Sequence, residues 1–158
     1  MTLATHILVA GALVKPLAGS IPTSLLFATA LASHYLSDAI PHYDYKLISK
    51  DRSAPDNPKL KKDWRLITID LARIFLDIAI GAAILYYLFP SLPFFWVVTG
   101  AILPDALQPL FWLYKKFPIK QTQAFHDFMH AELRLDFTAM AIFSQLALAA
   151  SSIAILAI

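Results

Sequence analysis

Long runs of apolar residues constrain the fold of this chain more than any other feature. Of its 158 residues, 58% are hydrophobic, which is too many for an ordinary soluble domain. A helix needs about 20 apolar residues to cross a bilayer. Five segments approach or reach that length, at about Leu3–Leu17, Ile21–Ile40, Leu66–Phe89, Leu92–Tyr114 and Phe137–Ile158. We therefore expect an all-α fold: a polytopic membrane bundle of about five transmembrane helices, with residues 1–158 forming a single domain.

The connections between these segments are of two kinds. Ala18–Ser20 and Pro90–Ser91 are short, so each should join two segments into a helical hairpin. The connections at about 42–65 and 115–136 are long and polar. Prolines between positions 53 and 58 predict a solvent loop in the first of these. The amphipathic pattern of the second predicts a short interfacial helix.

The basic residues are unevenly distributed along the chain. If the chain crosses the membrane five times, both long connections lie on the side where it begins. Twelve of the thirteen Lys and Arg residues then fall on or toward that side, and only Lys15 lies at the other. Positive charge marks the cytoplasmic side of a membrane protein. We predict an integral protein of the inner or plasma membrane with a cytoplasmic N-terminus and an external C-terminus.

The end of the second segment carries a dense group of metal-ligand side chains. The four-residue spacing of His34-x3-Asp38-x3-His42 puts them on one helical face, and Asp44 follows. Pro41 should end or bend the helix, which would let His42 and Asp44 turn back. One interpretation is a helix end at the headgroup level, where such residues gather. We favour metal ligands, because ionisable groups at membrane depth are costly.

A second histidine pair lies in the connection before the last segment. His126 and His130 are four residues apart, again on one helical face. Amphipathic connectors often carry such a pair, so its interpretation as metal ligands depends on the first group lying on the same side. Asp127 is a candidate general base or a partner that orients a histidine. The chain has no cysteine, so any metal site must use histidine nitrogen and carboxylate oxygen.

Four ionisable groups from four segments share one depth in the predicted bundle. At 1.5 Å per residue, His34 and Asp105 lie about 20 Å from the external boundary, and His6 and Asp77 about 18 Å. A carboxylate inside a span is a candidate functional group, so we interpret Asp105 as a ligand. Its alternative role is a helix N-cap behind Pro104.

Arg73 lies on one face of the third segment with Asp70 and Asp77. It either neutralises the two aspartates in an internal ion pair, or binds an anionic substrate such as phosphate. In the second case Asp77 is available as a general base. Both interpretations stay open.

Three sequence elements carry a family resemblance. They are Thr5-His6-Ile-Leu-Val-Ala-Gly-Ala, Leu36-Ser-Asp38-Ala-Ile-Pro-His42-Tyr-Asp44, and the pair His126 and His130. In these the chain resembles the membrane-bound metal-dependent hydrolases of the LexA-regulated inner-membrane type, although their His-Arg-Gly-x-Thr-His-Ser motif is absent. His34-x3-Asp38-x2-Pro-His42 is also similar, more distantly, to motifs of zinc-dependent phospholipase C and S1–P1 nucleases. That likeness implies phosphoester chemistry.

We therefore expect a membrane-embedded hydrolase at the cytoplasmic face, in which a metal-activated water attacks a phosphoester or lipid-linked substrate. Asp44, Asp77 or Asp127 would act as general base, and Arg73 would bind substrate. One or two divalent ions are expected; zinc is favoured, and manganese or iron are compatible. The predicted metal ligands are His6, His34, Asp38, His42, Asp105, His126 and His130.

Two other functional classes fit the same residues. The carboxylates could line the pathway of a cation-binding transporter or channel subunit, or the protein could be purely structural. The lipid bilayer is the expected partner in every case, and no nucleic acid is predicted as a partner. Whether the chain forms a homo-oligomer stays open.

Overall fold

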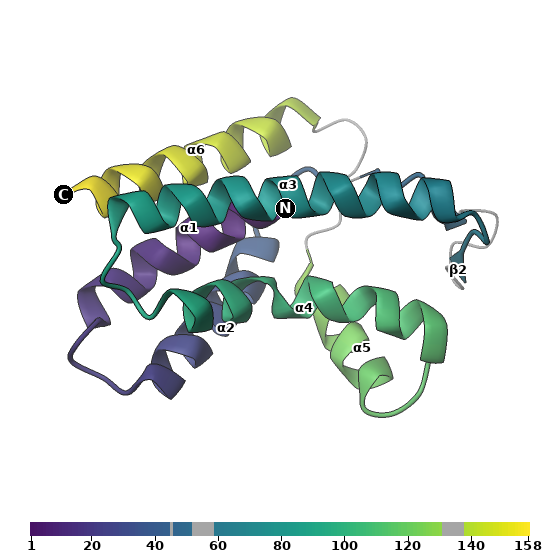
Figure 1. Cartoon of the computed structure of the whole chain (residues 1–158), viewed down its shortest axis with the longest axis horizontal. Helices are drawn as coiled ribbons and strands as arrows, with labels where there is room; N and C mark the ends of the chain where they lie inside the picture. The colour runs from purple at the N-terminus through teal and green to yellow at the C-terminus, as the bar shows by residue number, and fades with distance from the viewer. Residues whose placement is uncertain (45, 52–58, 131–137) are drawn as a thin grey trace.

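The computed structural model describes residues 1–44, 46–51, 59–130 and 138–158, and in these ranges the chain is mainly helical (Figure 1). The α-helices are α1 (Leu3–Val14), α2 (Thr23–Asp38), α3 (Trp64–Leu88), α4 (Phe94–Tyr114), α5 (Ile119–Met129) and α6 (Thr138–Ala157). A 3₁₀ turn, η1 (Lys15–Leu17), follows α1. Strands β1 (Lys50–Asp51) and β2 (Lys59–Leu60) pair antiparallel. The predicted helical class is confirmed.

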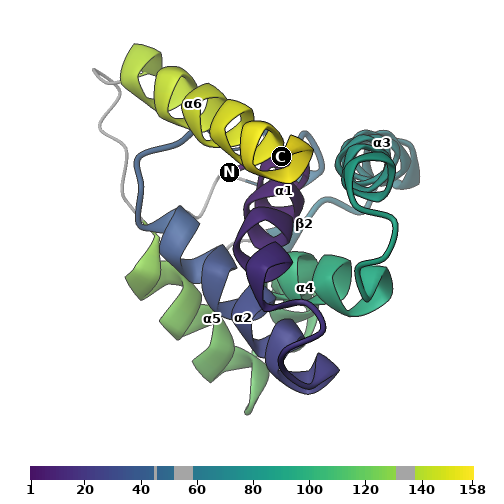
Figure 2. The same cartoon turned by 90° about the vertical axis from the view of Figure 1, so that its left-hand side faces the viewer.

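Helix α1 forms the centre of the bundle. It contacts α2, α3, α4 and α6, and Figure 2 shows these helices arranged around it. Most of its side chains are buried, among them the apolar Ile7, Ala10 and Val14. The core that surrounds it includes Leu26 of α2 and Leu85 of α3. α1 is apolar over most of its surface, and protein encloses most of it, with Leu13 as the exposed exception.

The predicted number of five spanning helices is not confirmed. In the described part of the chain, three helices are long and apolar enough to cross a membrane: Trp64–Leu88, Phe94–Tyr114 and Ala139–Ala157. Helix α1 has 12 residues and α2 has 16. At 1.5 Å per residue even α2 covers only about 24 Å, less than the about 30 Å of a hydrocarbon core. Pro22 and Pro41 set its length, because they flank the segment and neither can continue a helix.

The outer helices expose the apolar surface that a membrane helix needs. Of the 25 residues of α3, only Asp70, Gly81 and Leu85 are buried. The side chains of Phe75 and Tyr87 are 64% and 84% exposed. Exposed apolar surface of this extent, on helices of spanning length, is compatible with a membrane protein.

The two long connections fold differently. The second contains α5, an 11-residue helix at the place where a short helix was predicted. In the first, the strands β1 and β2 form a small hairpin where only a loop was predicted, and the backbone N–H of Lys61 donates to Ser49 O. The proline-bearing stretch 53–58 lies outside the described residues.

Contacts at both ends of α1 show how α1 and α6 are oriented relative to each other. Thr2 and Gln145 meet at the beginning of α1, and Lys15, beyond its end, donates to the carbonyls of Ile155 and Leu156 near the end of α6. α1 and α6 therefore run parallel. Lys15, the basic residue predicted to lie apart from the others, also satisfies carbonyls at a helix C-terminus, where a cation is favourable.

Two glycines bring helices together where a side chain would not fit. A Cβ at Gly81 of α3 would lie 2.6 Å from Ala4 Cα of α1, and a Cβ at Gly100 of α4 would lie 2.7 Å from Phe27 O of α2. Both distances are shorter than any carbon contact allows. These close approaches bring α3 onto α1 and α4 onto α2, and thus bring the polar residues of the four helices together.

We expect the substitution Gly81→Val to lower the thermal unfolding midpoint of the protein in detergent. Forcing extra atoms into a packed contact costs about 1–3 kcal/mol. Differential scanning fluorimetry would measure the shift, with Ala79→Val, an exposed position on the same helix, as the control. Equal midpoints for the two variants would contradict the tight contact between α1 and α3.

Candidate metal-binding site

All five histidines converge on three aspartates, in a cluster that runs from the buried His6 and His34 to the half-exposed Asp44. In each histidine Nε2 lies within 4 Å of a carboxylate oxygen. The residues come from α1, α2, the segment after α2, α4, and α5 with its C-cap. We call this set the His/Asp cluster, and its members are His6, His34, Asp38, His42, Asp44, Asp105, His126 and His130.

Asp38 lies at the middle of the cluster and uses both carboxylate oxygens. Oδ2 is 3.0 Å from His34 Nε2 and 3.6 Å from His126 Nε2. Oδ1 is 3.2 Å from His6 Nε2 and 3.6 Å from His42 Nε2. Its side chain is only 2% exposed. The two oxygens therefore face two different sets of histidines.

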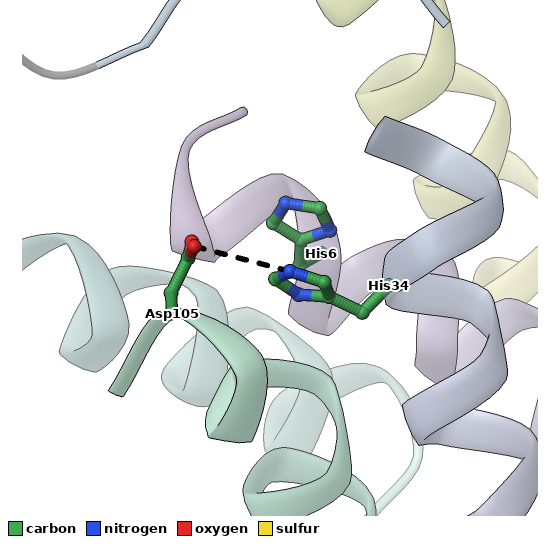
Figure 3. Close-up of side chains that lie close together, drawn as sticks. All are labelled: His6, His34 and Asp105. Atoms are coloured by element: carbon green, nitrogen blue, oxygen red, sulfur yellow. Dashed lines mark ion pairs between the residues drawn. The ribbon is translucent and has the colours of Figure 1, made fainter. Parts of the chain in front are cut away.

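One set is the inner group, which we define as His34, Asp105 and His126. Asp105 Oδ1 lies 3.9 Å from His34 Nε2 and 3.6 Å from His126 Nε2. His6 stacks on His34 with ring centres 3.9 Å apart. Figure 3 shows the two rings face to face, with Asp105 reaching toward them from α4. Both His6 and His34 are fully buried.

The other set is the outer group, which we define as His42, Asp44 and His130. Asp44 Oδ1 is 3.0 Å from His42 Nε2, and Asp44 Oδ2 is 3.2 Å from His130 Nε2. The amine of Met1 also lies 2.6 Å from Asp44 Oδ1. Asp44 is 51% exposed, so this group reaches the surface of the protein. The bend at Pro41 turns His42 and Asp44 back toward α2, as the sequence predicted.

A backbone carbonyl of α4 orients His34. Pro104 has no N–H, and its ring crowds the carbonyl four residues earlier, so the helix cannot keep regular bonding there. The next carbonyl, Ala101 O, lies 2.7 Å from His34 Nδ1 of α2. α4 stays helical from Phe94 to Tyr114 with both of its prolines inside, so the N-cap interpretation of Asp105 was wrong.

Two histidines have a tautomer that the structure determines. His34 Nδ1 lies 2.7 Å from Ala101 O, and His42 Nδ1 lies 2.7 Å from Ile40 O. A carbonyl oxygen only accepts hydrogen bonds, so each Nδ1 carries the proton and donates it. In the neutral ring, Nε2 then presents a lone pair to a carboxylate oxygen 3.0 Å away. Such a pair is repulsive unless a positive charge lies between the two atoms.

The cluster fits a divalent metal ion by three criteria. Its buried atoms without a hydrogen-bond partner include His6 Nε2, His34 Nε2 and Asp38 Oδ1, and an unpaired buried polar atom is costly. Two ligands on a tetrahedral ion at 2.0–2.1 Å are about 3.3 Å apart. The Nε2–oxygen distances of 3.0–3.9 Å fall around that value. Backbone carbonyls hold the far nitrogens of His34 and His42, as is usual for metal-bound histidine.

The electrostatics outside the spanning helices favour a neutral His126 and an ionised Asp44. Burial lowers the pKa of His126, so its ring is neutral at neutral pH. Burial also opposes ionisation of Asp44, but hydrogen bonds with His130 and His42 hold the pKa of its carboxyl below its usual range. The same hydrogen bond raises the pKa of His130. A metal ion needs neutral imidazole and ionised carboxylate.

Two of the predicted general bases, Asp77 and Asp127, lie apart from the cluster. Asp77 Oδ2 accepts the backbone N–H of Ala4, 2.9 Å away. Because the N-cap of α1 has no side-chain hydrogen bond, Asp77 takes over part of that role and so helps to position His6. Asp127 is exposed on α5 and accepts a hydrogen bond from Gln123. Its carboxylate is therefore turned away from the neighbouring His126.

Arg73 pairs with Asp70 rather than with the cluster. The distance from its Nη1 to Asp70 Oδ1 is 3.7 Å, and its side chain is 55% exposed. Asp70 Oδ2 in turn accepts hydrogen bonds from the backbone N–H and the hydroxyl of Ser49, at 2.8 and 2.7 Å. This arrangement matches the ion-pair interpretation of Arg73 for Asp70 but not for Asp77, and it ties the segment around Ser49 to α3.

We expect Asp70→Asn to release the Ser49 segment without changing the cluster. The substitution weakens two hydrogen bonds to a carboxylate, each worth about 1.5–3 kcal/mol. Amide hydrogen exchange across residues 46–51 should become faster, whereas metal content should not change. Arg73→Ala is the control, because it keeps both bonds to Ser49. Equal exchange rates in the two variants would contradict the anchoring role of Asp70.

Sequence reasoning missed Gln108. Its Nε2 lies 3.0 Å from Asp105 Oδ1 and 3.3 Å from His126 Nε2, so it connects two members of the inner group. Its spacing of three residues from Asp105 on a helix was a usable signal, since residues three apart share a face. Ala101 O left no such signal, because any residue supplies a carbonyl.

No family model, curated protein or solved structure matches this chain. The geometry of the His/Asp cluster is therefore the main basis for assigning a function.

Proposed function

We propose that this protein is a membrane-embedded hydrolase that binds two divalent metal ions in the His/Asp cluster and cleaves a phosphoester at the cytoplasmic face. The observation that carries the proposal is the position of Asp38. Its Oδ2 faces His34 and His126 of the inner group, and its Oδ1 lies 3.6 Å from His42 of the outer group, which supports one ion at each group. The resemblance to membrane-bound metal-dependent hydrolases agrees with this chemistry.

Protonation of the histidines would be another way to relieve the repulsion between Nε2 and the carboxylates. Five imidazolium rings would then face three aspartates in a mostly buried space. Two stacked rings, His6 and His34, would both be positive at 3.9 Å. Metal binding avoids this, because one ion satisfies several neutral rings at once. Nitrogen-rich ligand sets favour zinc among the divalent ions.

The proposal assigns each residue of the cluster a role as metal ligand or general base. His34, Asp105, His126 and His6 would hold the inner ion, His42 and His130 the outer one, and Asp38 both. A bound divalent ion polarises a phosphoryl oxygen and lowers the pKa of a water in contact with it. Asp44 is the general base that the geometry supports best, because it is the most exposed carboxylate of the cluster. Asp77 and Asp127 have other contacts.

The test is to purify the protein without chelators and to measure its metal content by mass spectrometry. We expect about two divalent ions per chain, as in other two-metal sites. Phosphodiesterase activity, measured on a chromogenic diester and on phospholipids, should disappear with chelator and return with zinc. A protein that holds no stoichiometric metal would contradict the proposal. Bound metal without turnover would instead support the cation-binding alternative.

A further inference from the structure

A mainly apolar cavity of about 680 Å³ lies between α3 and α4. Leu71, Phe75 and Ile78 line it from α3, and Ile102 and Trp112 line it from α4. The space exists because α3 packs on α1 and α6, whereas α4 packs on α1, α2 and α5. Figure 1 shows the two helices lying apart over this stretch. Small-molecule sites typically measure about 300–1,000 Å³, so the cavity is large enough for a ligand.

The cavity meets the His/Asp cluster along one wall. Asp105 of the inner group and Asp44 and His130 of the outer group all line it. A molecule in the cavity therefore reaches both groups. The rest of the lining is mainly apolar, so the ligand that fits must combine a polar group with a long apolar part.

The part of the cavity rim around Lys50 carries positive charge, although Asp51 lines the cavity beside it. Lys50 lines the cavity, and its Nζ lies 5.4 Å from the centre of the Trp112 ring, a cation–π contact that holds the ammonium group at the wall. An adjoining surface hollow is lined by Lys46, Lys50 and Lys61 and by one acidic residue, Asp51. Three positive charges against one negative charge attract an anionic group.

The helices that form the walls have the length and the apolar composition of spanning helices. A ligand with a hydrocarbon chain can therefore enter the cavity from the bilayer without crossing water. A soluble phosphoester would leave the apolar walls uncovered, at a cost proportional to the uncovered area. The chemistry of the walls thus favours a lipid over a water-soluble ester.

We infer that the cavity binds a phospholipid, with a hydrocarbon chain between α3 and α4 and the phosphoryl group between Lys50 and the His/Asp cluster. The inference rests on the proposed function for the role of the phosphoryl group, and it names the substrate class. The binding itself depends on the cavity and on Lys50, so it is measurable without any metal.

The experiment uses phosphatidic acid with a photoreactive diazirine in its acyl chain, added to the full-length protein in detergent. Labelled peptides identified by mass spectrometry should concentrate in residues 71–78 and 102–112. Ala106 lines the cavity, and Ala106→Phe should reduce this labelling about fivefold. Ala72→Phe is the matched control, because Ala72 is exposed on α3 and outside the cavity lining. Labelling spread evenly over α3, α4 and α6, or equal in the two variants, would overturn the inference.

A second pair of variants tests the phosphoryl end. Lys50→Gln should reduce labelling by phosphatidic acid about fivefold but leave labelling by the matching diacylglycerol probe unchanged. Lys120→Gln, an exposed position on α5, should change neither. Equal loss with both probes would contradict a phosphate contact at Lys50. Repeating the labelling with chelator separates the two proposals: focused labelling of a protein that never holds metal supports the lipid site and refutes the metal-dependent hydrolase.

Discussion

Replacing Asp38 with alanine is expected to remove both metal ions, so that the metal content falls from about two per chain to none. Asp38 is the residue whose two oxygens face both groups: Oδ2 lies 3.0 Å from His34 Nε2 of the inner group, and Oδ1 lies 3.6 Å from His42 Nε2 of the outer group. Loss of even a residue that only orients a ligand weakens metal binding about 10–100-fold. Loss of a ligand shared by two ions should exceed that. Metal analysis by mass spectrometry after gel filtration measures the change.

The matched control for Asp38→Ala is Asp63→Asn. Asp63 caps α3 by accepting the N–H groups of Arg65 and Leu66, and asparagine caps a helix equally well. This variant should keep its full metal content. Circular dichroism of both variants shows whether the helices remain. A folded Asp38→Ala protein that still holds two ions would refute the shared-ligand arrangement.

Replacing His130 with alanine is expected to remove one ion and leave the other. His130 contacts Asp44 and His42, both in the outer group, at 3.2 Å each. His126→Ala should likewise lose one ion, because His126 Nε2 lies 3.6 Å from Asp38 Oδ2 and from Asp105 Oδ1. Each single variant should therefore hold about one ion per chain, and the double variant none.

Metal analysis at a fixed free zinc concentration distinguishes two separate ion sites from a single site that all the ligands share. If either single substitution removes all the metal, the cluster binds one shared ion. If neither changes the metal content, His126 and His130 are not ligands. Gln123→Ala on α5 is the control, since Gln123 bonds to the exposed Asp127 and not to the cluster.

The convergence of the histidines was predictable from the sequence because it follows from helix geometry. A rise of 1.5 Å per residue along alternating segments puts His6, His34 and Asp105 at one depth, and the structure brings their ligand atoms within 4.8 Å of one another. Asp77 satisfied the same count but bonds to Ala4 N instead. Residues at the same depth in the bundle meet only if their helices are also rotated toward each other. That rotation depends on packing, which the residue count does not give.

The number of membrane-spanning helices was less predictable, because composition does not reveal whether lipid or protein surrounds a helix. α1 is as apolar as a membrane span, yet it is short and enclosed by α2, α3, α4 and α6. An apolar segment in a protein interior and one in lipid have the same composition. The difference becomes visible only when burial is known.

The sequence by itself determined the helical class and the side chains that are available as metal ligands. Apolar runs require helices in a membrane, and without cysteine the strong side-chain ligands are histidine and carboxylate. Only the tertiary structure decided which of these side chains contact one another. It made Asp38 the central carboxylate, paired Arg73 with Asp70, and left a cavity between α3 and α4. The physical reason is that these outcomes depend on contacts between distant segments, such as Gly81 with Ala4, whereas residue type and spacing act locally.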